Sequence, residues 1–204
     1  MEKNIRTPQQ KRSIEKKQKI IEAATVVLSE KGYFGTTTAD IAAAAGISVG
    51  TVYAYFKDKK DILLTSMRDF GKSLHQEIEQ ELSELPTDDS FFKTTRKIVE
   101  ITVAYHQKWL SGRHHNDVLS LQYIDPDISA YFLDIQKQIE QLLNLALSKR
   151  GWKLRHPHEQ VYLMFQMIDD LSETLTFHQR DDLDPKVLID QAAEVIVAMI
   201  VPQS

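Results

Sequence analysis

Residues 37–56, TTADIAAAAGISVGTVYAYF, decide the fold of this chain. Thr37 is a suitable N-cap for a helix, and Asp40 three residues later can complete a capping box with it. Gly46 ends this helix, because a left-handed residue after the last turn costs glycine almost nothing. The first half of the stretch therefore predicts a short helix with a glycine stop.

The second half predicts another helix, over about 49–56, which Ser48 can cap. Val52 and Phe56 lie four residues apart and share the face that we expect to be buried. The apolar side chains expected inside are Ile41, Ala42, Ala45, Val52 and Phe56. A helix, a glycine turn and a second helix that begins with small or hydrogen-bonding residues form a helix-turn-helix.

The outward face of the second helix separates two interpretations, a structural hairpin and a DNA-binding motif. A helix start that meets only solvent usually carries Glu, Asp or Lys, whereas this one carries Val49, Gly50 and two tyrosines, and three lysines follow within 57–60. Hydroxyl and aromatic groups beside lysines suit a phosphate backbone, which favours the second interpretation. The residues predicted to contact DNA are Thr36, Thr37, Thr38, Ser48, Val49, Gly50, Thr51, Tyr53, Tyr55 and Lys59.

Two kinds of contact are expected within this set. The threonine hydroxyls, the two tyrosines and Lys59 would hold phosphates, and a phosphate would offset the cost of a cation in the first turn of the helix after the motif. Residues 48–51 would approach the bases but include no Arg, Asn or Gln, so direct readout should be modest. DNA shape and a basic N-terminal arm would add to it, although the arm could equally be a solvated tail. The expected operator is an inverted repeat rich in A·T pairs.

Residues 32–64, GYFGTTTADIAAAAGISVGTVYAYFKDKKDILL, resemble the DNA-binding signature of TetR-type bacterial transcriptional repressors. The resemblance extends from about Ile20 to Leu64 and includes a TVY-x-YF-x-x-K core. It implies a homodimer on double-stranded DNA, and a small-molecule effector, of unknown identity, that binds the helical body and releases the operator. It also implies that the helix after the motif carries motion from the body to the DNA-binding head.

Composition and charge limit the classes of function. The 204 residues are 42% hydrophobic and 26% charged, as in a typical globular protein, and the absence of cysteine excludes disulfides and suits a cytoplasmic protein. The first 62 residues carry 11 Lys/Arg against 7 Asp/Glu, whereas the rest carry 14 against 22. The basic end is therefore the one expected to meet nucleic acid.

The remaining pattern predicts an all-α fold, in which a three-helix head is followed by a larger helical body. Residues 1–12 are expected to form a flexible basic arm, and 13–57 the helix-turn-helix domain, whose first helix covers about 13–31. The ligand-binding and dimerisation domain would span 58–204, with helix 58–85 as the link. No apolar run reaches the roughly 18 residues of a membrane-spanning helix, so no membrane partner is expected.

The last helix, expected over 186–201, is apolar on most sides and should be buried on most sides. A second subunit could cover it in a four-helix bundle, or its own domain could do so. The residues predicted for the dimer interface are Val161, Phe165, Ile168, Leu188, Ala192, Val195, Ile196 and Met199. Large side chains of the body are candidates for the effector site, although each would also suit a core. These are Tyr105, His106, Trp109, Tyr123, Phe132, Met164, Phe165, Met167, Asp170 and Phe177.

Enzymatic function receives no support, since no phosphate loop, nucleophile elbow or paired catalytic carboxylate motif appears. No metal-binding pattern frames the histidines, so neither a metal nor a cofactor is expected. The helix-turn-helix and the resemblance to TetR-type repressors together imply a DNA-binding repressor released by an effector, which is the predicted function. Two rivals remain, a DNA-binding or architectural protein without an effector, and an all-α small-molecule carrier.

Overall fold

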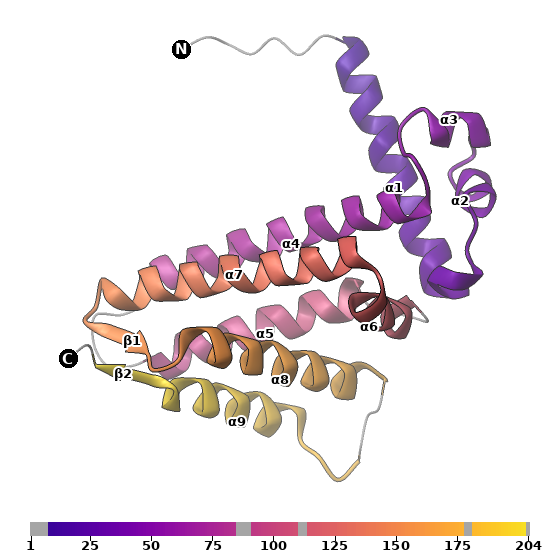
Figure 1. The fold of residues 1–204 in the computed structure, drawn as a ribbon. Coiled ribbons are helices and arrows are strands. Elements are labelled where there is room, and N and C mark those ends of the chain that lie inside the picture. Colours follow the sequence, from indigo (N-terminus) through magenta and orange to yellow (C-terminus); the bar gives the residue numbers. More distant parts are fainter. Residues whose placement is uncertain (1–7, 85–90, 110–113, 178–180, 203–204) are drawn as a thin grey trace, which may run out of the picture. The chain divides into compact units, whose positions relative to one another are not determined.

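The computed structural model describes residues 8–84, 91–109, 114–177 and 181–202 (Figure 1). Within these ranges the chain forms helices and one small sheet, which confirms the predicted all-α class. The helices are α1 (Pro8–Gly35), α2 (Thr38–Ala44), α3 (Val49–Tyr53), α4 (Lys59–Ser83), α5 (Phe91–Trp109), α6 (His114–Ile124), α7 (Pro126–Ser148), α8 (Pro157–Phe177) and α9 (Pro185–Ala198). The strands are β1 (Trp152–Leu154) and β2 (Ile200–Pro202).

The chain divides into two compact units, and the division is not a single cut in the sequence. Unit 1 consists of residues 1–69 and 112–124, and unit 2 of residues 70–111 and 125–204. Helix α4 runs through the boundary, and α6 belongs to unit 1 although it lies far along the chain. The sequence-based boundary at 57/58 did not anticipate that α6 joins the helix-turn-helix.

Unit 1 is organised around the inner faces of α1, α2, α3, α6 and the start of α4. The apolar residues expected inside the helix-turn-helix are all buried, and Ile20 and Leu63 are buried with them. Helix α1 begins at Pro8, inside the segment that we expected to be flexible up to residue 12; residues 1–7 of that arm lie outside the described part. Gly32 interrupts α1 with φ 74° and ψ 168°, a conformation that glycine adopts freely.

Unit 2 packs α5 against α8 and α9, and α7 against α8, around a continuous apolar core. β1 and β2 pair antiparallel, with Lys153 opposite Val201. This pair was not expected from the sequence, and the last helix, expected to reach residue 201, ends at Ala198. Three-residue strands carry too little alternation to be recognised from their own residues. No described helix is long and apolar enough to cross a membrane.

Candidate nucleic-acid interface

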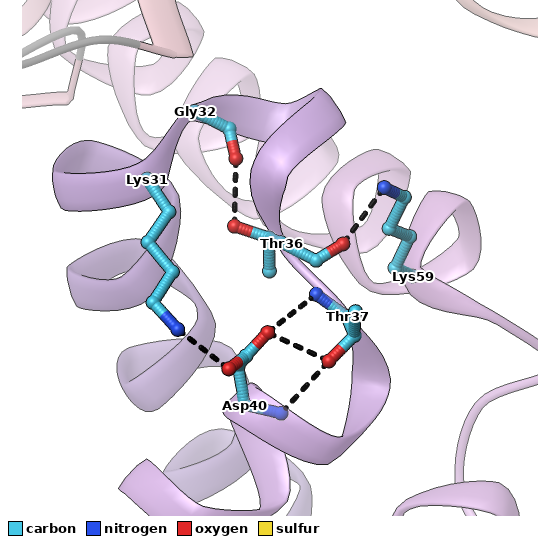
Figure 2. A network of polar contacts seen from close by, with 6 residues as sticks. All are labelled: Lys31, Gly32, Thr36, Thr37, Asp40 and Lys59. Atoms are coloured by element: carbon cyan, nitrogen blue, oxygen red, sulfur yellow. Dashed lines mark hydrogen bonds and ion pairs between the residues drawn. The ribbon is translucent and has the colours of Figure 1, made fainter.

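The first helix of the motif begins with the capping box that the sequence predicted. The Thr37 hydroxyl accepts a hydrogen bond from the Asp40 amide at 3.2 Å, and the Asp40 carboxylate accepts one from the Thr37 amide at 2.9 Å. Lys31 of α1 adds an ion pair to the same carboxylate at 2.5 Å (Figure 2). The hydrogen bonds from Lys31 and Thr37 hold the pKa of Asp40 well below its usual range. These contacts fix the start of α2 against α1.

The turn and the second helix of the motif follow from glycine and serine. Gly46 has φ 62°, which confirms the left-handed residue after α2. Ser48 caps α3 by accepting a hydrogen bond from the Thr51 amide at 3.1 Å. Helix α3 ends at Tyr53, which makes it shorter than the predicted helix over 49–56. Residues 54–56 continue as a turn in which the Tyr55 and Phe56 amides bond back to the Val52 carbonyl.

The outer surface of the motif presents small, aromatic and hydroxyl groups. The side chains of Val49 and Tyr53 are 37% and 55% exposed, and Ser48 and Gly50 are also exposed. The Tyr53 hydroxyl lies 3.0 Å from that of Thr38, so α3 and α2 present a paired hydroxyl surface. Thr51 and Tyr55 are half-buried beside them. Most of the predicted DNA-contact residues therefore lie at the surface of one motif.

Thr36 is an exception, and its side chain does not reach the surface. It is only 1% exposed, and its hydroxyl donates a 2.6 Å hydrogen bond to the Gly32 carbonyl (Figure 2). In a continuous helix the Gly32 carbonyl would accept a hydrogen bond from the backbone amide four residues later. Because the helix is broken at Gly32, the Thr36 hydroxyl takes the place of that amide. The expectation that this hydroxyl contacts phosphate is therefore wrong in this structure, and Thr36 is a structural residue.

Lys59 has protein partners that the sequence did not indicate. Its ammonium group donates to the Tyr33 carbonyl at 2.6 Å and to the Thr36 carbonyl at 2.8 Å, and it lies 4.4 Å from the centre of the Tyr33 ring. Burial lowers the pKa of Lys59, while the charge of Asp117 acts in the opposite direction. The two carbonyls offset the unfavourable position of a cation at a helix start, so a phosphate is not needed to explain it.

Asp117 of α6 is a functional candidate that sequence reasoning missed. Its carboxylate accepts hydrogen bonds from the backbone amides of Tyr33 at 2.6 Å and Phe34 at 3.3 Å. The residue is 84 positions away from Tyr33 in the sequence. A glycine stop predicts that nearby amides need a partner, but no local pattern identifies one at this distance.

The predicted effector residues are not brought together as one set. Tyr123 is 76% exposed on α6 in unit 1, so it is not part of the unit that holds the others. Met164 is buried in the core of unit 2, Phe165 and Met167 pack against that core, and Asp170 is exposed. Tyr105 and Phe132 are half-buried, and the side chains of His106, Trp109 and Phe177 lie outside the described part.

Tyr105 has the best-defined polar contact among the effector candidates. Its ring centre lies 5.3 Å from that of Phe70. A hydrogen bond with Glu77 raises the pKa of its hydroxyl. Tyr105 therefore makes an apolar contact through its ring and a polar contact through its hydroxyl, both with residues of α4.

The predicted dimer residues divide into two groups. Val161, Ala192 and Ile196 are buried in the core of unit 2, and Phe165, Ile168, Leu188 and Met199 pack against that core. Val195 alone in this set is an exposed large apolar residue. Of the two kinds of cover considered for the last helix, its own domain provides it for most of this stripe, because α5 and α8 pack against α9. Among the described side chains of α8 and α9, the large apolar residues that are exposed are Tyr162, Leu163, Val187 and Val195.

Among the described residues, no three His, Asp or Glu side chains are grouped as a metal site would require. The geometry that stands out is a capped helix-turn-helix whose outer face carries aromatic and hydroxyl groups. Such a surface can approach a phosphate backbone and the floor of a DNA groove.

Comparison with known proteins shows what the motif is similar to. Residues 20–65 match the sequence model described as "Bacterial regulatory proteins, tetR family". The HTH-type transcriptional regulator HbdR of Aromatoleum sp. is 41% identical over 71 residues, which are 35% of this chain and 31% of HbdR. The fatty acid metabolism regulator protein of Bacillus subtilis is 27% identical over 124 residues, 61% of this chain and 58% of that protein. The matched parts thus cover less than two thirds of both relatives.

A solved structure extends the similarity to nearly the whole chain at the level of the fold. The crystal structure of the transcriptional regulator FadR of Bacillus subtilis, in complex with stearoyl-CoA, superposes with a TM-score of 0.64 at 22% identity. The alignment covers 89% of this chain and 97% of that one. At this identity the similarity concerns the fold.

Proposed function

We propose that this chain is a transcriptional regulator that binds DNA through its N-terminal helix-turn-helix, the part that matches the tetR family of bacterial regulatory proteins. It would be a homodimeric repressor that a small molecule releases from its operator. The protein would act in the cytoplasm on an inverted repeat. Each subunit of the dimer would place one α3 in the major groove, about 34–36 Å from the other.

The exposed face of α3 is the observation that carries the DNA-binding mode. Val49 and Tyr53 stand outside the core on a helix whose inward Val52 is fully buried, so the outward face is available for contact. Val49 would touch a thymine methyl group and Gly50 would admit the DNA backbone closely. Tyr53, Tyr55 and Thr38 would hold phosphates through their hydroxyls. Thr37 would instead order the start of α2, because its hydroxyl donates to the Asp40 carboxylate at 2.6 Å.

Lys59 would still bind a DNA phosphate, through the third N–H donor of its ammonium group. Lysine has three N–H donors, and the two carbonyl bonds use two of them. The same side chain would then order the turn before α2 and meet the DNA backbone.

The dimer would form through the exposed apolar residues of α8 and α9. Tyr162, Leu163, Val187 and Val195 are each more than two fifths exposed, on helices that pack against each other. Val187 and Val195 are eight residues apart and therefore share one face of α9. A second copy of this surface would cover these residues in a self-complementary interface.

The effector would bind within the helical body, as the similarity in fold to a FadR–stearoyl-CoA complex suggests. The core of unit 2 is built from aliphatic, aromatic and methionine side chains, which suits a largely apolar molecule. We therefore propose a long-chain acyl compound as the first effector class to be tested. Such a ligand releases the operator only if it binds the DNA-free form better, and such coupling is typically about 1–3 kcal/mol.

Fluorescence anisotropy with DNA from upstream of the gene that encodes the protein tests the proposal. We expect binding that weakens steeply with salt, and release on addition of stearoyl-CoA but not of free coenzyme A. Binding that no acyl-CoA weakens would contradict this effector class, and failure to bind any duplex would contradict the DNA-binding mode. A thermal shift with stearoyl-CoA checks binding to the body independently of DNA.

A further inference from the structure

The turn at residues 32–36, called here the 32–36 turn, connects α1 to α2 and has an unusual need for hydrogen-bond partners. The conformation of Gly32 interrupts α1, so the amides of Tyr33 and Phe34 begin a new helical turn. Amides at the start of a helical turn have no partner within it. Tyr33 is itself buried, so its amide cannot rely on solvent.

Asp117 of α6 supplies the partner from another part of the chain. One oxygen of its carboxylate accepts both amides, at 2.6 Å from Tyr33 and 3.3 Å from Phe34. This is the contact that an N-cap residue makes, except that the acceptor is 84 positions away from Tyr33. Neighbouring Val118 and Leu121 are buried, which holds α6, and with it the carboxylate, in unit 1.

Two carbonyls of the 32–36 turn are bonded to the start of α4, which follows the helix-turn-helix. The Tyr33 and Thr36 carbonyls accept from Lys59, the first residue of α4. Figure 2 shows the bond to the Thr36 carbonyl. Thr36 is followed at once by Thr37, the cap of α2. Asp117 therefore binds the amide of Tyr33 while Lys59 binds its carbonyl, and the starts of α2 and α4 depend on the same short segment.

We propose that Asp117 is a positioning residue of the DNA-binding site, whose carboxylate caps the 32–36 turn and thereby sets the placement of Thr37, Thr38 and Lys59. The residue itself does not contact DNA in this proposal. Its role makes α6 a part of the DNA-binding unit, although α6 follows α5 in the chain. The proposal rests on the DNA-binding function stated above and adds a residue outside the motif to it.

The direction in which loss of Asp117 changes DNA affinity distinguishes a positioning role from a purely electrostatic effect of its charge. DNA repels carboxylates, so loss of Asp117 would strengthen binding to every duplex if only its charge mattered. Positioning predicts the opposite, because an uncapped turn must be ordered again on binding. We expect Asp117→Ala to weaken operator binding about tenfold, and Asp117→Asn, which keeps an acceptor oxygen, to weaken it less. The salt slope should stay unchanged in both variants.

The experiment measures operator affinity by anisotropy and hydrogen exchange of the Tyr33 and Phe34 amides by NMR, on the full-length protein. Ser120→Ala is the control on the same helix, since that exposed hydroxyl donates to the Asn116 carbonyl within α6 itself. Ile20→Val is the control for stability, because it removes one buried methylene elsewhere in unit 1. Both controls should bind the operator as the wild type does.

Two results would overturn the proposal: unchanged exchange of both amides in folded Asp117→Asn and Asp117→Ala, or operator affinity in those variants that equals or exceeds that of the wild type. If Asp117→Ala does not fold, Asp117→Asn decides. Failure of the wild type itself to bind DNA would refute the function and not the cap, which the amide exchange reports without DNA.

Discussion

The helix-turn-helix and the last helix, α9, differ in what determines which of their side chains are buried. In the motif, Thr37, Asp40, Gly46 and Ser48 act on backbone groups no more than a few residues away. Those contacts fix the path of the chain, and the path fixes the buried face. In α9 the cap at Asp184 sets only the start, and the covering helices α5 and α8 decide the rest.

Two neighbouring residues of α9 show the consequence. Ile196 is 9% exposed and Val195 is 47% exposed, although both were predicted for the same interface. An amphipathic pattern identifies the buried face only when one face is polar, and α9 has apolar residues on most sides. Features that depend on local signals were therefore predicted correctly from the sequence, whereas the buried and exposed faces of an apolar helix were not.

Ile196→Glu should have the largest effect on this contrast. The charge would enter the core of unit 2 without a partner, at a cost of roughly 3–5 kcal/mol. We expect unit 2 to unfold or to melt far below the wild type, as followed by circular dichroism and by the fluorescence of Trp152. A variant that keeps the wild-type melting temperature would show that Ile196 is not a core residue.

Val195→Glu, one residue earlier, should leave the subunit folded and separate the dimer. The side chain already meets solvent in one subunit, so only a partner subunit would bury the charge. Sedimentation should show monomers, and operator affinity should fall about 100-fold or more, because the two motifs no longer bind together. Leu145→Glu is the matched control, since Leu145 of α7 is 55% exposed and lies outside the proposed interface. A dimeric Val195→Glu variant would place the interface elsewhere.

The features of the fold and the candidate site that could be predicted from the sequence are those set by local contacts. The caps of α2 and α3, the left-handed Gly46 and the buried Val52 and Phe56 all followed from short spacings. Contacts between distant segments could not be predicted in this way, because nothing in the sequence near Gly32 indicates that Asp117 is its partner. Lys59 was recognised as unusual for its helix position, but its partners are carbonyls at the end of α1 and before α2.

The effector site remains a prediction for a related reason. Aromatic and methionine side chains have the same periodicity whether they fill a core or line a cavity. Tyr123 illustrates the limit, because it lies on α6 and no sequence pattern indicates that α6 joins unit 1. Assignment of that helix required knowledge of what its buried Val118 and Leu121 pack against.

Lys59→Ala tests whether this residue combines a structural role with a phosphate contact. Loss of a phosphate contact should lower the salt slope of DNA binding by about one unit. Loss of its bonds to Tyr33 and Thr36 should weaken DNA binding further. This second loss of affinity should not depend on salt, so it should remain when the affinity is extrapolated to 1 M salt. Lys57→Ala, which removes an exposed neighbouring cation, should lower the slope alone. An unchanged slope in Lys59→Ala would leave Lys59 as a purely structural residue.

Asp40→Asn should have the smallest effect, and the effect should depend on pH in a defined direction. Hydrogen bonds from Lys31 and Thr37 depress the pKa of Asp40 in the folded protein, so its ionised form stabilises unit 1. That stabilisation is complete above the unfolded pKa of about 3.9 and is lost as pH falls toward the lower folded value. Hydrogen exchange of the Ile41 amide, in the first turn of α2, should be faster in the variant near pH 6. The difference from the wild type should shrink progressively once the pH is below about 4. A difference that stays constant down to pH 2 would mean that the charge of Asp40 does not stabilise the cap, and that the Thr37 hydroxyl alone holds the start of α2.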